Sequence, residues 1–163
     1  MPGLIDAFDE LGRPDAHLLI AGSPEDDEME ASLQRRVEKR DDVSAVFEFI
    51  PNDRVQEFMN AGDVIVLPYR DIMTSGSVLL AMSFARPVVA PEMGCIPAIT
   101  DDDGGFLYDP NDPEGLVNAL RAAYEEGGRV REMGERNYCR ETELSWDGVG
   151  RDTVDIYERA TDR

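Results

Sequence analysis

Short apolar runs alternate with amphipathic segments along most of this chain. The runs are rich in valine, isoleucine and leucine and have the length of buried strands, whereas the segments between them show helical spacing of apolar residues. The predicted strands are 17–21, 43–49, 64–67, 87–90 and 105–108, and the predicted helices are 2–11, 23–39, 52–61, 75–85, 96–100, 112–126, 130–142 and 146–160. Strands that alternate with helices in this way favour an α/β fold with a doubly wound parallel sheet, Rossmann-like and in a single domain.

Polar residues and glycines mark several of the predicted helix ends. Asn52 or Asp53 is expected to cap the helix that ends at Ala61. The run Asp112-Pro113-Glu114 offers a cap, a proline for the first helical position and an acid for the first turn. The pair Gly127-Gly128 is expected to stop that helix.

The aromatic residues of the last two helices have the spacing of core positions. Tyr138, Trp146 and Tyr157 are therefore expected to be buried. Tyr69 differs from them because it follows Pro68 at the end of a predicted strand, where it could face a cleft.

Four loops are expected to converge on one edge, because ligands of parallel α/β sheets bind outside the carboxyl ends of the strands. The most informative of them contains Thr74-Ser75-Gly76-Ser77, which follows one predicted strand and opens a helix. The backbone N–H groups of Ser75, Gly76 and Ser77 could cradle a diphosphate, and the hydroxyl groups add donors. The alternative is an ordinary helix cap. The four loops are 22–23, 49–52, 69–77 and 92–95.

Two further residues near this loop are candidates for ligand contact. Asp71 could accept hydrogen bonds from sugar hydroxyls, or it could simply be solvated. Gly94 either lets a ligand approach the backbone or makes a turn. The sequence contains no Ser-His-Asp arrangement, metal-ligand cluster, Walker loop or Gly-x-Gly-x-x-Gly fingerprint. We therefore expect no metal and no cofactor.

The charge of the chain is strongly negative. It carries 35 Asp and Glu against 16 Lys and Arg, a net charge of −19, with Lys39 as its single lysine. The acids are spread along the whole length, which favours a salt-adapted surface and a halophilic source over an acidic patch for a basic partner. Nucleic-acid binding is not expected, because it needs clustered basic residues.

Composition also bears on location. No apolar run approaches 18 residues, and the amino-terminal segment is acidic and amphipathic, unlike a signal peptide. A cytoplasmic protein is expected. Cys95 and Cys139 lie far apart and are expected to be free thiols.

Three motifs in order resemble the carboxyl-terminal domain of retaining glycosyltransferases of family 4, also called group 1, which have the GT-B fold. They are AGDVIVLPY at 61–69, LAMSFARPVVA at 80–90 and DGGFLYDPNDP at 103–113. Gly94 and Pro97 match the family's glycine and proline between the last two motifs, and Ser145-Trp146 resembles the start of its final helix. The resemblance covers nearly all of the chain.

The resemblance implies a donor-binding function. A nucleotide-diphosphate sugar would be the substrate, with its diphosphate held by the backbone at 74–77, and the sugar would pass to an acceptor with retention of configuration. Gly22, Ile50 and Pro51 would lie near the base and ribose. Asp71 becomes the candidate catalytic residue, shifted by one position from a family glutamate. Peripheral association of the parent protein with a membrane stays open.

The chain also departs from the family pattern. The family's two glutamates, eight residues apart, fall on Ile72 and Leu80, and its glycine before Pro-Val-Val is Ala85. The first strand of the domain, a Gly-Arg…Lys-Gly segment and an amino-terminal acceptor domain are expected to be missing from 1–163, which would leave this chain inactive alone. Two alternatives remain, namely a non-catalytic nucleotide-sugar-binding module and a partner-binding descendant of the fold.

The salt-adapted surface predicts how stability responds to salt. Thermal unfolding should shift to higher temperature between low salt and molar KCl, because salt screens repulsion within a chain of net charge −19. A fold that gains no stability over this range would contradict a halophilic adaptation.

Overall fold

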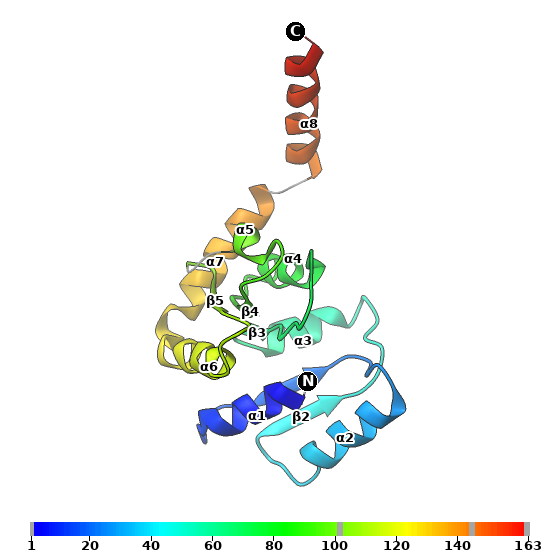
Figure 1. Ribbon diagram of the computed structural model, residues 1–163, viewed down its shortest axis with the longest axis vertical. Helices are drawn as coiled ribbons and strands as arrows, with labels where there is room; N and C mark the ends of the chain where they lie inside the picture. The colour runs from blue at the N-terminus through cyan, green and yellow to red at the C-terminus, as the bar shows by residue number, and fades with distance from the viewer. Residues whose placement is uncertain (1, 101–102, 144–145, 162–163) are drawn as a thin grey trace.

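A computed structural model of the chain describes residues 2–100, 103–143 and 146–161. The elements follow the predicted order (Figure 1). The strands are β1 (Leu18–Ala21), β2 (Val43–Val46), β3 (Ile65–Val66), β4 (Val88–Pro91) and β5 (Gly105–Tyr108). The helices are α1 (Pro2–Leu11), α2 (Asp27–Val37), α3 (Val55–Ala61), α4 (Gly76–Ser83), α5 (Ile96–Ile99), α6 (Gly115–Glu125), α7 (Gly127–Glu143) and α8 (Trp146–Thr161).

All strand pairs are parallel, as the sequence predicts for crossovers made by helices. They form two ladders, however, one of β1 and β2 and one in the order β3-β4-β5. A single continuous sheet is therefore not seen within the described residues, because no pairing joins the β1-β2 ladder to β3. The two ladders nevertheless share one hydrophobic core, in which Ile20 and Val43 of the first lie in the same cluster as Val89 and Phe106 of the second.

The best buried part of the molecule is the pair of elements β4 and α4. Val88, Val89 and Ala90 have no exposed surface, and neither do Val78 and Met82 of α4. Such a strand, apolar on both faces, is typical of the centre of a parallel sheet. Because α4 packs beside β4 and follows β3, its first turn is fixed at the carboxyl edge of the β3-β4-β5 ladder.

Three predicted helix ends are wrong in detail. Helix α3 begins after Arg54 without a side-chain cap, so neither Asn52 nor Asp53 caps it. Asp112 does not start α6, because its carboxylate accepts the N–H of Glu114 in a local turn and the helix begins at Gly115. The start of the next helix is also misplaced, because α7 begins at Gly127 and not at 130, although α6 does end at Glu125, just before Gly127-Gly128, as predicted.

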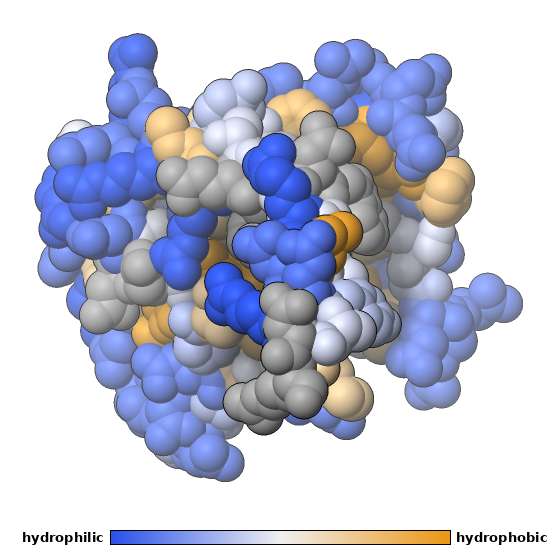
Figure 2. Space-filling view, turned by 90° about the horizontal axis from the view of Figure 1, so that it is seen from above, coloured by the Kyte–Doolittle hydropathy of each residue, from blue (hydrophilic) through white to orange (hydrophobic). Residues whose placement is uncertain are grey.

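The last helices are less buried than predicted. Tyr138 is 50% exposed and Tyr157 is 70% exposed, so neither is a core residue, and the side chain of Trp146 lies outside the described part of the structure. Figure 1 shows the reason for Tyr157, since α8 extends away from the rest of the molecule. Viewed from the end that carries α8, the surface is mainly hydrophilic, with apolar residues only in small patches (Figure 2).

A buried amide joins α7 to the beginnings of two strands. Asn137 is 2% exposed, and its Nδ2 donates to the carbonyl oxygens of Arg86, at 3.0 Å, and Gly104, at 2.7 Å. Close by, α7 approaches the turn before β4, where Ala85 has a left-handed backbone with φ of +53°. A Cβ added at Gly134 would lie 2.0 Å from the Ala85 carbonyl oxygen, so only glycine fits there.

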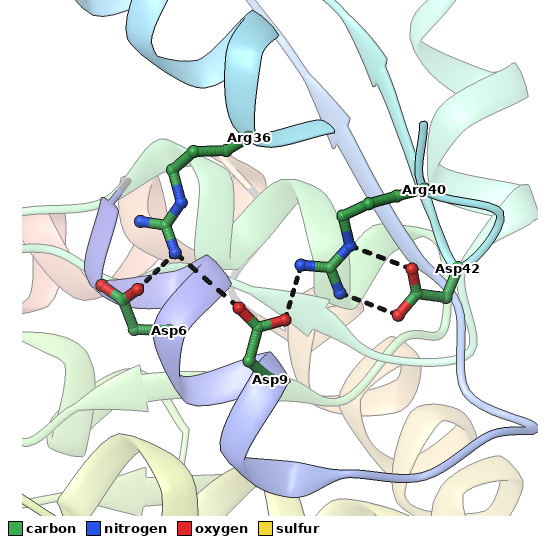
Figure 3. A network of polar contacts seen from close by, with 5 residues as sticks. All are labelled: Asp6, Asp9, Arg36, Arg40 and Asp42. Carbon is green, nitrogen blue, oxygen red and sulfur yellow. Dashed lines mark hydrogen bonds and ion pairs between the residues drawn. The ribbon is translucent and has the colours of Figure 1, made fainter. Parts of the chain in front are cut away.

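Five charged residues connect α1, α2 and β2 at the amino-terminal end of the chain (Figure 3). Arg36 pairs with Asp6 and Asp9, and Arg40 pairs with Asp9 and donates to both carboxylate oxygens of Asp42, at 3.0 and 2.8 Å. The arginine in this bidentate pair lowers the pKa of Asp42 below its ordinary value of 3.8. Exposed ion pairs contribute little individually, so we expect this network to orient α1 against α2 more than to stabilise the core.

The left-handed backbone of Ala85 predicts a stabilising substitution. Ala85→Gly should stabilise the fold by about 0.5 to 1 kcal/mol, because relief of left-handed strain exceeds the added entropy of the unfolded chain. Urea denaturation measures the change. Ala31→Gly, the same substitution inside α2, is the matched control and should destabilise by about 1 kcal/mol. An equal loss of unfolding free energy in Ala85→Gly and Ala31→Gly would contradict backbone strain at Ala85.

The bidentate pair of Arg40 and Asp42 predicts a pH dependence. A lowered pKa in the folded state stabilises the protein above about pH 4 and loses this effect as pH falls through the folded-state pKa. The difference in unfolding free energy between the wild type and Asp42→Asn should therefore shrink between about pH 5 and about pH 2. The difference in unfolding free energy between the wild type and Arg40→Gln should shrink over the same pH range. A difference in unfolding free energy that stays constant down to about pH 2 would contradict a stabilising ion pair between Arg40 and Asp42.

Candidate functional site

The start of α4 is the centre of the candidate site. Ser75 precedes the helix with an extended backbone, and its Oγ accepts the N–H of Val78 at 3.2 Å. The interpretation of Ser75 as a helix cap is therefore confirmed. Its hydroxyl oxygen is buried with it, since Ser75 is only 4% exposed.

The cap leaves the next backbone groups at the helix start available to a ligand. The first N–H groups of any helix have no partner within it, and here they belong to Gly76 and Ser77. Gly76 is exposed, and nothing lies within 4 Å of the place where its Cβ would be. Thr74 is exposed as well, and Ser77 is half-buried. The arrangement offers an anion two N–H donors and the positive end of a helix dipole.

Gly94 supports the loop before α4. It has a left-handed backbone with φ of +56°, and a Cβ there would lie 2.5 Å from the carbonyl oxygen of Ile72 and 2.6 Å from that of Met73. The next residue, Cys95, donates its N–H to the carbonyl oxygen of Met73 at 2.9 Å. The structure thus joins two of the four predicted loops and assigns Gly94 a close contact with loop backbone.

Tyr69 connects the end of β3 to the start of α4. Its hydroxyl lies 2.9 Å from Ser75 Oγ, and its side chain packs partly buried against the apolar cluster of α4 and β4. It also lines a cavity of about 350 Å³ together with Arg70 and Tyr108. The sequence-based suggestion that Tyr69 could face a cleft is confirmed.

This cavity includes residues that the sequence analysis missed. Beside Tyr69 it is lined by Gly3 and Leu4 at the start of α1, by Tyr108 at the end of β5 and by Pro110 after that strand. The rule that ligands bind at the carboxyl ends of parallel strands, extended to the last strand, predicts that Tyr108 lies at the site. No local sequence pattern predicts that α1 lines this cavity, because its position there depends on the packing of α1 against α6.

The three residues predicted near a base and ribose lie on the other ladder. Gly22 follows β1 with φ of +136°, and its N–H donates to the carbonyl oxygen of Val46 at the end of β2. Ile50 and Pro51 are half-buried after β2, and the Pro51 carbonyl accepts N–H groups at the start of α3. These residues therefore occupy carboxyl ends of strands, but no described contact joins them to the loop before α4.

Charges near the candidate site are mixed. Arg70 and Asp71 are both exposed beside the loop, with Glu92 exposed after β4. A tyrosine phenol is protonated at neutral pH and can act as a hydrogen-bond donor, and burial raises the pKa of the Tyr108 phenol further. A larger cavity of about 570 Å³ runs along β5 and α6, and its lining includes Asp103, Asp109, Asp112 and Glu126 as well as Arg129. Among the described residues that line the smaller cavity, Asp112 is the single carboxylate and Arg70 adds a positive charge, so the smaller cavity opposes a phosphate less.

The two apolar residues at the expected glutamate positions have different surroundings. Ile72 packs partly buried against the cluster that contains Val78 and Met82, so its side chain serves the fold of the loop. Leu80 is half-buried on α4. Neither provides an acceptor for a sugar hydroxyl.

The described residues hold no group of three or more His, Cys, Asp or Glu side chains arranged to bind a metal ion. None of the helices that they form is both long and apolar enough to cross a membrane.

Comparison with known proteins identifies the family. A family model described as Glycosyl transferases group 1 matches residues 2–126, which is most of the chain. The chain belongs to the glycosyl transferases of group 1.

Two curated relatives extend this finding. An alpha-maltose-1-phosphate synthase of Mycolicibacterium smegmatis is 33% identical over 165 residues and aligns with 91% of this chain. A GDP-mannose:glycolipid 4-beta-D-mannosyltransferase of Xanthomonas campestris pv. campestris is 28% identical over 150 residues and aligns with 88% of it. This chain spans 42% of the length of each relative.

Solved structures share the fold. Sucrose-phosphate synthase from Thermosynechococcus elongatus superposes on 98% of this chain with a TM-score of 0.75 and 20% identity. Anabaena HepE in complex with UDP and glucose superposes on all of it with a TM-score of 0.76 and 18% identity. This chain covers 42% and 45% of those chains. Its fold is the Rossmann-like α/β fold of GT-B glycosyltransferases.

Proposed function

We propose that this chain is the donor-binding part of a retaining glycosyltransferase of family 4, which moves a sugar from a nucleotide-diphosphate donor to an acceptor. The observation that carries the proposal is the start of α4 at the carboxyl end of β3, where Gly76 is exposed and the N–H groups of Gly76 and Ser77 have no partner within the helix. Membership of the group 1 family supports sugar transfer as the reaction.

The chemistry proposed for α4 is stabilisation of a leaving anion. Charge develops on the diphosphate as its bond to the sugar breaks, and fixed N–H donors at a helix start interact with that charge without rearrangement. Arg70 is a candidate side chain for additional positive charge, since it belongs to the loop before α4 and lines the cavity beside Tyr69. Asp71, exposed in the same loop, is the candidate acceptor for donor-sugar hydroxyls, and Gly22, Ile50 and Pro51 are the candidates near base and ribose.

The donor class is proposed from the relatives. One is named for GDP-mannose, and HepE was solved with UDP and with UDP-glucose. We therefore propose a nucleotide-diphosphate sugar as substrate, with neither metal nor cofactor, in a cytoplasmic parent protein. The acceptor would bind to an amino-terminal domain, in keeping with the 42% of the relatives' length that this chain spans.

We further propose that a strand from outside this chain lies between β1 and β3. Within the described residues, β1 pairs only with β2 and β3 pairs only with β4, so each has one unpaired edge, and yet buried residues of both ladders share one core. A parallel strand in that position would satisfy both edges and complete one sheet.

A second candidate is a nucleotide-sugar-binding module without catalysis. Ile72 and Leu80 favour it, because they leave two positions without the carboxylates that would contact sugar and ribose. Incubation of the intact gene product with nucleotide sugars and acceptors distinguishes the two. Transfer supports the enzyme, the anomeric configuration of the product by NMR tests retention, and binding without transfer or hydrolysis supports the module.

The diphosphate assignment predicts the effect of one substitution. Gly76→Val in the intact gene product should weaken binding of UDP, GDP or ADP by at least about tenfold in calorimetry, because the side chain fills the approach to the N–H groups. The fold should persist, since an added Cβ meets nothing within 4 Å.

Gly128→Val is the matched control, because Gly128 also has nothing within 4 Å and lies at the start of α7. Its affinity should equal that of the wild type. Unchanged affinity in Gly76→Val would reject the assignment of the phosphate loop.

A further inference from the structure

We propose that Tyr69 is a positioning residue, whose hydroxyl fixes Ser75 and, through Ser75, the direction of the first N–H groups of α4. The inference rests on the proposed diphosphate site. It assigns a role to a residue that need not touch the donor. The contact that carries it is the 2.9 Å distance between Tyr69 Oη and Ser75 Oγ.

The hydroxyl of Ser75 has little freedom. Its oxygen accepts the N–H of Val78 at 3.2 Å, and the residue is 4% exposed, so water cannot readily replace a missing partner. A serine hydroxyl has one donor and two acceptor sites. The bond with Tyr69 uses one of the two that remain, whichever of the oxygens donates. This second partner holds the Ser75 side chain in the rotamer that caps the helix.

Packing alone does not explain a tyrosine at this position. The ring of Tyr69 lies partly buried against the cluster formed by Val78, Met82 and Ile96, a surface that phenylalanine would cover equally well. The hydroxyl adds a polar group beside an apolar cluster, which costs free energy unless the group is hydrogen-bonded. Its partner is Ser75, the residue that caps α4, so the hydroxyl serves the helix start.

The segment between Tyr69 and Ser75 needs such an anchor. Most of it is exposed, and Met73 reaches 83% exposure. On the far side the segment is held by the bond from the N–H of Cys95 to the carbonyl oxygen of Met73. On the near side it is held where Tyr69 meets Ser75. Preorganised donors matter for a leaving anion, because small displacements of a catalytic group lower rates strongly.

Calorimetry on the intact gene product tests the inference with UDP, GDP and ADP, each compared with its own nucleoside. Tyr69→Phe should lower the affinity for the diphosphate about fivefold to tenfold and leave the affinity for the nucleoside unchanged, because only the anion contacts the α4 amides. Ser75→Ala should have a similar effect. The double variant should be no weaker than the worse single variant, because both substitutions break the same bond.

Two further variants complete the experiment. Ser75→Thr keeps the hydroxyl and should retain at least half of the diphosphate affinity. Tyr124→Phe is the matched control, because it removes a tyrosine hydroxyl that donates to Asp15 at 2.7 and 2.8 Å, away from α4. Its affinity should not change.

Each outcome decides a different claim. If the wild type binds none of the three diphosphates, the proposed function and this inference both fall. If it binds one and Tyr69→Phe binds it equally well, the inference alone is overturned. If diphosphate and nucleoside affinities fall together, Tyr69 supports the fold in general and does not position the amides.

Discussion

The burial of β4 against α4 is the constraint on which the rest of the structure depends. Both elements are apolar on the sides that face each other, and their central residues have no exposed surface. Because α4 cannot shift without opening this core, its first turn keeps a fixed position at the carboxyl end of β3. The loop before it is then held by short-range contacts at Tyr69, Ile72 and Gly94. The apolar packing of β4 against α4 thus determines the position of the backbone N–H groups at the start of α4.

An acidic chain that binds a diphosphate faces an electrostatic conflict. With a net charge of −19, long-range repulsion opposes any anion that approaches. The proposed site relies on backbone N–H groups at contact distance, and such hydrogen bonds act over a few ångströms. At about 1 M salt the screening length is only about 3 Å, so repulsion from distant carboxylates vanishes while the direct bonds persist. A salt-rich environment and an amide-based anion site are therefore compatible.

Local patterns predicted the elements of the fold well because each strand and helix has its own hydrophobic period. Residues 105–108 form the predicted strand, and 2–11 the predicted helix. The errors come from competition that the pattern does not reveal. Asp112 prefers a local turn to a cap, and Tyr157 has helical spacing on α8, which extends away from the rest of the molecule. The split into two ladders depends on pairing between distant segments.

The sequence predicted the part of the site that lies within a single loop, and it did not predict the contacts between loops. The position of 74–77 follows from the carboxyl-end rule, and Ser75 follows from the preference of serine for helix caps. The bond between Tyr69 and Ser75, the fit of Gly94 against Ile72 and Met73, and the share of α1 in the cavity are tertiary contacts. Ile72 looked like a lost functional residue, and the structure gives it a second reason to be apolar, since it anchors its loop to the core.

The contact between Ala85 and Gly134 limits the order in which this sequence can change. Position 134 admits no side chain while the Ala85 carbonyl lies 2.0 Å from its Cβ site, whereas position 85 already holds a residue that its backbone conformation disfavours. A lineage can exchange alanine and glycine at 85 with only a small change in stability, which favours glycine. It cannot replace Gly134 first, because the turn before β4 would have to move, and Asn137 holds that turn through Arg86. The two positions therefore evolve under unequal constraint, although they touch.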